Sequence, residues 1–322
     1  MALIASGCGG GGDAGSTSSR ESSPARPAPA SRSQRRIAQH VAYRPLFSLA
    51  AAVQDPAIAT LGQRRLVLLG GIDAAGNSTA AVVLADPHAQ LRTSVLPGPQ
   101  HDAEAATLGA DVYVFGGGYL SELDHIVRYD AVSGAVTAAG SLPRPASDVA
   151  VTESGGSAYI IGGYDGSNWL DTILAWRPGK PARIVGRLPV GLRYAAVSAT
   201  GGDLLIIGGS TPSGPSDAIL RFDPATGSVK RIGRLPAPVE HASSAQLAGW
   251  VYLVGGRGES ADSKTADVLA IDPRSGRVRR AGRLPQPLSD AGVAALGHAI
   301  IVAGGRTADG PQAAVGELVP AG

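Results

Sequence analysis

Six strand-like apolar runs each end in a pair of glycines, and these pairs recur at a nearly constant interval. The pairs are Gly70-Gly71, Gly116-Gly117, Gly162-Gly163, Gly208-Gly209, Gly255-Gly256 and Gly304-Gly305. Successive pairs are 46, 46, 46, 47 and 49 residues apart. A fixed period of this length is typical of repeat architectures, so we expect six copies of one structural unit.

Each period contains four strand signals separated by glycine, aspartate, serine or proline. In the second period they cover residues 102–109, 111–117, 125–130 and 134–143. Four short strands per unit, repeated radially, predict a β-propeller. The fold class is therefore all-β, with four-stranded antiparallel blades.

The ends of the chain predict how the ring closes. Five periods finish their fourth strand in Leu-Pro, at Leu96-Pro97, Leu142-Pro143, Leu188-Pro189, Leu235-Pro236 and Leu284-Pro285. The last period stops after three strands, whereas residues 41–50 form a spare strand where a Leu-Pro strand would lie. We expect this N-terminal strand to complete the last blade, because closure removes exposed sheet edges. The prediction is one six-bladed propeller over residues 37–322.

The repeats resemble kelch repeats. The resemblance rests on the Gly-Gly ends, the aspartate turns after the third strand (Arg-Tyr-Asp at 128–130, Arg-Phe-Asp-Pro at 221–224) and the Leu-Pro closures. Residues 162–167, Gly-Gly-Tyr-Asp-Gly-Ser, match the kelch core best. The tryptophan usual in kelch repeats is replaced by Val136, Val229 and Val278. The resemblance implies the fold, whereas the function of any kelch subfamily does not follow from it.

The N-terminal region predicts a different kind of segment. Residues 1–8 are apolar and end at the only cysteine, Cys8, in a context similar to the lipobox of bacterial lipoproteins. Residues 9–36 are rich in Gly, Ser, Pro and Arg, a composition typical of a disordered tether. Lipidation at Cys8 would make this an extracytoplasmic, membrane-anchored protein. Only seven residues precede Cys8, so a cytoplasmic protein with an incidental cysteine is the alternative.

Charge argues against a nucleic-acid partner. The chain has 28 basic and 26 acidic residues, and the first 40 residues hold five of the former and two of the latter. The remainder is close to neutral and offers no basic patch for a phosphate backbone. We expect a monomer that contacts a membrane only through an anchor at Cys8.

Aligning the repeats on Leu-Pro predicts a ring around the central channel. The residue six positions after each leucine, counting also from Leu49, is Asp55, Asp102, Asp148, Tyr194, His241 or Asp290. This pattern predicts a carboxylate-rich mouth for a cation or a hydroxyl-rich ligand. The alternative is that the aspartates cap tight turns by accepting nearby backbone amides. Whether the mouth binds a metal stays open.

Further candidates lie on the same predicted face, which collects the loops after Gly-Gly and after Leu-Pro. Arg193 and Glu240 directly precede two ring positions. Tyr119 and Trp169 lie in the loops after Gly-Gly and could stack on a sugar or anchor a protein. Blade packing is the alternative for both aromatic residues.

Signatures of established enzyme classes are few. The chain has no Gly-x-Ser-x-Gly elbow, phosphate-binding loop or His-Glu-x-x-His motif, and its histidines lack metal-ligand spacing. We therefore expect no cofactor. Copper oxidases with kelch-like propellers need a cysteine cross-linked to tyrosine, which a lone Cys8 outside the propeller cannot supply.

Two functions compete. The first is a non-enzymatic recognition or scaffold domain that binds a protein or glycan through this face. The alternative is a carbohydrate-active enzyme, because some six-bladed kelch proteins are sugar-ring mutarotases acting on sialic acid. Such an enzyme needs a carboxylate-binding arginine and an acid–base pair, roles for which Arg193, Glu240 and His241 are candidates.

Overall fold

The computed structural model describes residues 40–321, and all of their regular structure is β-strand. The segments predicted at 1–8 and 9–36, including Cys8, lie outside the described residues. No helix long and apolar enough to cross a membrane occurs between residues 40 and 321.

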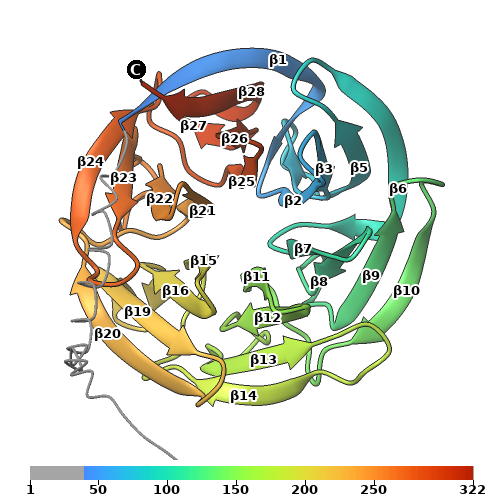
Figure 1. Ribbon diagram of the computed structural model, residues 1–322. Coiled ribbons are helices and arrows are strands. Elements are labelled where there is room, and N and C mark those ends of the chain that lie inside the picture. Colours follow the sequence, from blue (N-terminus) through green and yellow to red (C-terminus); the bar gives the residue numbers. More distant parts are fainter. Residues whose placement is uncertain (1–39, 322) are drawn as a thin grey trace, which may run out of the picture. The chain divides into compact units, whose positions relative to one another are not determined.

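Six four-stranded antiparallel blades form a ring, which confirms the predicted fold class (Figure 1). The first blade contains β2 (Ala57–Leu61), β3 (Arg65–Leu69), β5 (Thr79–Ala85) and β6 (Gln90–Gln100). The second contains β7 (Glu104–Leu108), β8 (Asp111–Phe115), β9 (His125–Asp130) and β10 (Val136–Ser141). The third contains β11 (Ala150–Ser154), β12 (Ser157–Ile161), β13 (Thr172–Trp176) and β14 (Arg183–Arg187).

The other three blades repeat this order. The fourth contains β15 (Ala196–Thr200), β16 (Asp203–Ile207), β19 (Ala218–Asp223) and β20 (Ser228–Arg234). The fifth contains β21 (Ser243–Leu247), β22 (Trp250–Val254), β23 (Asp267–Ile271) and β24 (Val278–Arg283). The sixth contains β25 (Gly292–Leu296), β26 (Ala299–Ala303), β28 (Gly310–Pro320) and β1 (Val41–Gln54). Short pieces β4 (Ile72–Asp73), β17 (Ser210–Thr211), β18 (Gly214–Pro215) and β27 (Arg306–Thr307) lie in the loops after Gly-Gly.

The N-terminal strand closes the ring as predicted. β1 pairs antiparallel with the C-terminal β28, with Val41 opposite Pro320 and Ser48 opposite Ala314 (Figure 1). It is longer than the expected 41–50, because Val53 and Gln54 also pair with β4. The two ends of the propeller therefore share one blade.

The Leu-Pro positions are explained by packing between blades. The leucines at 49, 96, 142, 188, 235 and 284 are all buried. Four outer strands end just before their Leu-Pro pair, whereas β6 continues through Pro97 to Gln100. The first strands of neighbouring blades contact one another around the axis: β2 with β7, β7 with β11, and so on to β25 with β2. This arrangement brings the loops that enter the first strands together at one mouth of the channel.

Candidate functional site

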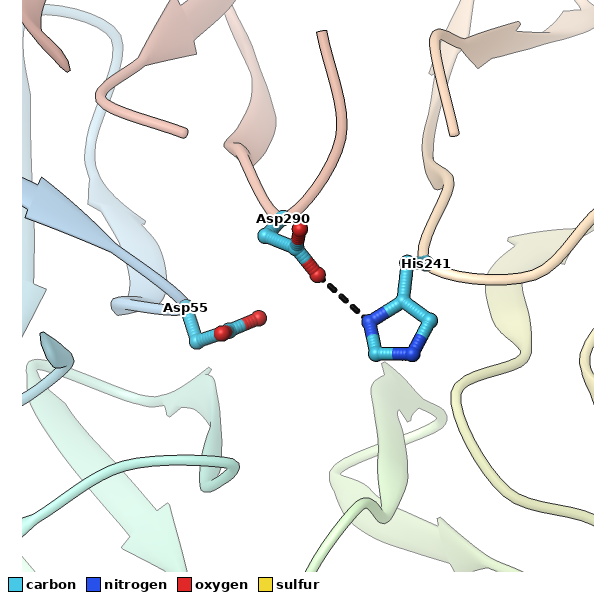
Figure 2. A group of neighbouring side chains, drawn as sticks. All are labelled: Asp55, His241 and Asp290. Carbon is cyan, nitrogen blue, oxygen red and sulfur yellow. Dashed lines mark hydrogen bonds and ion pairs between the residues drawn. The ribbon is translucent and has the colours of Figure 1, made fainter. Parts of the chain in front are cut away.

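The six predicted ring positions meet at the mouth of the channel. All six have a left-handed backbone, with φ between 50° and 58°. The amides of five of them donate to the carbonyl of the equivalent residue in the neighbouring blade, at 2.8–3.3 Å. The side chains surround a cavity of about 60 Å³, here called the mouth cavity. Figure 2 shows three of these side chains, Asp55, His241 and Asp290, pointing toward one another.

The backbone conformation explains part of the residue choice. Aspartate tolerates the left-handed region better than most residues, whereas tyrosine and histidine there cost about 1–2 kcal/mol each. The turn-capping alternative fails, however. Within residues 40–321, the carboxylates of Asp55, Asp148 and Asp290 accept hydrogen bonds from side chains and none from a backbone amide.

A second ring surrounds the first and contains residues that the sequence analysis missed. Each residue preceding a ring position pairs with the residue directly after a glycine pair, for example Glu240 with Arg257 and Ser289 with Arg306. These bridges confirm that the loops after Gly-Gly and after Leu-Pro share one face. Counting one residue past each glycine pair would have found both arginines.

Arg193 is held by aromatic rings and one carboxylate. Its guanidinium carbon lies 4.4 Å from the ring centre of Tyr164, 5.0 Å from that of Trp169 and 5.1 Å from that of Tyr194. Its Nε donates to Asp148, whose side chain is only 1% exposed. Burial opposes the charge of Arg193, but Asp148 and Tyr194 together outweigh it and raise the pKa of Arg193. The result is a permanent cation whose orientation is fixed at the rim.

His241 lies at the centre of a second network. Arg257 donates from Nη2 to His241 Nε2 at 2.8 Å and from Nη1 to Glu240 at 2.9 Å. An arginine can only donate, so Nε2 accepts and the imidazole proton is on Nδ1. That proton is donated to Asp290, 2.5 Å away (Figure 2). Tyr194 stacks on the imidazole, with ring centres 3.7 Å apart.

This network changes the role expected of Glu240. Its side chain is buried and bonds Arg257, and it lies outside the lining of the mouth cavity. His241 and Asp290 do line the cavity. The acid–base pair offered to a ligand is therefore His241 with Asp290, and Glu240 acts through Arg257.

Three carboxyl groups of the ring have shifted pKa values, and the shifts differ in direction. Burial and the charges of Asp290 and Asp102 raise the pKa of Asp55 well above its usual range. Burial and the charge of Asp148 do the same for Asp102. For Asp290, bonds from His241 and Ser289 outweigh burial and lower its pKa. Carboxyls with opposite pKa shifts are typical of sites that transfer protons.

Glu104 adds one more carboxyl to the lining of the mouth cavity. Burial raises its pKa to about 8, against a small opposing effect of the Ala105 amide. The unfolded chain loses this proton near pH 4. Its contribution to stability is thus complete below that pH and is lost as pH rises to about 8.

Glu104→Gln should therefore flatten the pH dependence of stability. We expect its free energy of unfolding to fall by about 2 kcal/mol less than that of the native protein between pH 5 and pH 8. Urea unfolding at the two pH values measures this difference. Glu259→Gln, at an exposed loop position, should keep the native slope. An unchanged slope in Glu104→Gln would show that this carboxyl is ionised throughout.

The two aromatic candidates behave differently. Trp169 joins the rim through Arg193. Tyr119 is 50% exposed, and the structure does not bring it to the ring.

Comparison with known proteins supports the fold. No family model matches the chain, and no curated protein matches it. The solved structure of YjhT superposes with a TM-score of 0.72 at 17% sequence identity, over 85% of this chain and 96% of that chain. A kelch-like propeller fits this similarity.

The first function considered from the sequence, a non-enzymatic recognition or scaffold domain, is wrong. At 17% sequence identity the similarity to YjhT is a similarity of fold. The site itself speaks against a recognition face, because its ionisable groups surround a recess and lie partly or fully buried, whereas a docking face would present them flat to solvent.

Proposed function

We propose that the protein is a carbohydrate-active enzyme of the sialic-acid mutarotase type. One observation carries the proposal: an oriented arginine, Arg193, lies against the ring of Tyr194, which stacks on the imidazole of a His241–Asp290 pair at the mouth cavity. The arginine can anchor an anionic sugar, and the His241–Asp290 pair can accept and return a proton.

The reaction needs no co-reactant. The anomeric hydroxyl loses its proton, and the bond between the anomeric carbon and the ring oxygen breaks with its electron pair going to that oxygen. The ring oxygen takes up a proton, which leaves an open-chain carbonyl. Closure on the other face of the carbonyl reverses each step, so protons and electrons balance.

The residues divide these tasks between them. Arg193 has an Nη1 group free of the bonds to Asp148 and Tyr194, and we assign it to the sugar carboxylate. Asp290 orients His241, and this pair exchanges protons with the sugar oxygens. Glu240 and Arg257 fix the imidazole tautomer, and Trp169 covers one side of Arg193. The three have positioning roles.

The activity is tested by the rate at which the two anomers of N-acetylneuraminic acid exchange, measured by NMR. We expect acceleration that saturates with substrate, and little effect on glucose, which lacks the carboxylate. His241→Gln should lose activity by about 100-fold, in the usual range for an acid–base group. An exchange rate equal to that of buffer alone for every acidic sugar tested would overturn the proposal.

We further propose that the degenerate repeats are kelch repeats and that Cys8 carries a lipid. Support for the first is the Gly-Gly, aspartate-turn and Leu-Pro pattern, together with the propeller similarity. Support for the second is the short apolar segment before Cys8 and the tether-like composition after it. An extracytoplasmic location would place the site where free sugars arrive.

A further inference from the structure

The floor of the mouth cavity crowds several carboxyl groups together with few cationic partners. Four ring positions are carboxylates, here called the ring carboxylates: Asp55, Asp102, Asp148 and Asp290. One possible metal-ligand atom from each of Asp55, His241 and Asp290 lies within 4.8 Å of the other two. Among the described residues, one guanidinium, that of Arg193, pairs directly with this set.

A buried acceptor without a donor faces the same cavity. Oδ1 of Asp148 is fully buried and has no hydrogen-bond partner in the described part of the chain. Its side chain is 1% exposed and lines the mouth cavity. An unpaired buried carboxylate oxygen is costly, so it points to a group that the protein chain does not supply.

One further carboxyl group, which does not belong to the ring carboxylates, reaches the cavity. Glu104 lines both the mouth cavity and the next cavity along the channel. Among residues 40–321, its side chain has one hydrogen bond, a long contact of 3.4 Å from the Ala105 amide. Asp148 and Glu104 therefore both offer oxygen atoms to the enclosed space.

The type of ligand follows from the donor atoms. Both nitrogens of His241 are in use, since Nε2 accepts from Arg257 and Nδ1 donates to Asp290. A cation could bind the imidazole only by displacing Arg257 or the Nδ1 proton, so carboxylate oxygens are the ligand atoms that remain. Oxygen-only sites select hard cations, and calcium accepts six to eight such ligands in irregular arrangements, whereas zinc prefers nitrogen and sulfur.

We propose that the mouth cavity binds a hard divalent cation, calcium in particular, between the ring carboxylates. Glu104 approaches the ion from the channel side, and water completes its coordination. The cavity of about 60 Å³ has room for one ion and its waters. This site lies below the rim that holds Arg193, and the inference does not depend on the proposed reaction.

The test uses the full chain after treatment with a chelator. Calcium should raise its melting temperature and titrate calorimetrically as one site with a dissociation constant of at most about 1 mM. Terbium, a hard ion of similar size, should bind there and emit on tyrosine excitation because Tyr194 lines the cavity. Calcium should displace terbium, and zinc should not.

Variants locate the ion. Asp55→Asn with Asp102→Asn should weaken calcium at least about tenfold, because asparagine keeps the left-handed backbone but loses the charge. The charge-matched pair Asp203→Asn with Asp309→Asn should bind as the native chain does. No calcium binding by the folded native chain would overturn the proposal. So would equal affinity in both double variants, or displacement of terbium by zinc alone. Each of these measurements detects cation binding. A chain that binds no calcium would leave the mutarotation proposal untouched, and a chain without mutarotase activity would leave the calcium proposal untouched.

Discussion

Replacing Arg193 with methionine is expected to remove mutarotation of acidic sugars, with kcat/KM falling at least about 100-fold. Methionine keeps an apolar stem against Tyr164 and Trp169 but removes the charge that would hold a carboxylate. The free energy of unfolding should also fall by about 3 kcal/mol, because Asp148 is left buried without its cation. NMR exchange of the sugar anomers and urea unfolding measure the two effects.

A double variant separates catalysis from stability. Asp148→Asn in the Arg193→Met background removes the unpaired charge, so most of the lost stability should return while activity stays absent. Arg193→Lys should be intermediate, since lysine restores the charge but not the planar group that stacks on three rings. If the double variant regained activity together with stability, Arg193 would be a structural residue only.

Gly163→Ala is expected to destabilise the fold strongly, with a loss of at least about 4 kcal/mol. Gly163 has φ of +104°, and a Cβ there would lie 2.7 Å from both the Ser147 carbonyl oxygen and Val149 Cγ1. The obstacle is backbone from the neighbouring loop, so it cannot move aside without shifting the ring. The measurement is the free energy of unfolding in urea.

Gly202 provides a matched control for the backbone strain. Its φ is +98°, and a Cβ there would meet nothing within 4 Å. Gly202→Ala should therefore show the strain alone, about 2 kcal/mol. Equal losses in the two variants would mean that the close approach between the loops contributes nothing.

Much of the fold could be predicted because its signals are local. The glycine pairs, the Leu-Pro ends and the alternating apolar runs each describe a few neighbouring residues, and their period gives the number of blades. Counting from Leu-Pro also placed Asp148, His241 and the other ring positions correctly around one mouth. A rotational repeat makes this possible, since equivalent positions in sequence become neighbours around an axis.

The hydrogen-bond partners and the cavity lining of the site escaped prediction because they depend on contacts between blades. Arg257 enters from a loop of variable length, and counting from its glycine pair gives its position but not its partners. Only the folded ring brings it to His241, which fixes the imidazole proton and moves Glu240 behind the rim. Glu104 was likewise hidden, because an inward-facing strand residue looks like any other until the channel around it is closed.

The sequence by itself thus determined the architecture and the residues that meet at the mouth, because both follow from a repeated local pattern. The tertiary structure alone decided whether that mouth is a flat face or a recess, which charges are paired, and which carboxyls keep their protons. Those properties depend on burial and on distances of a few ångströms between different blades, and no local pattern encodes them.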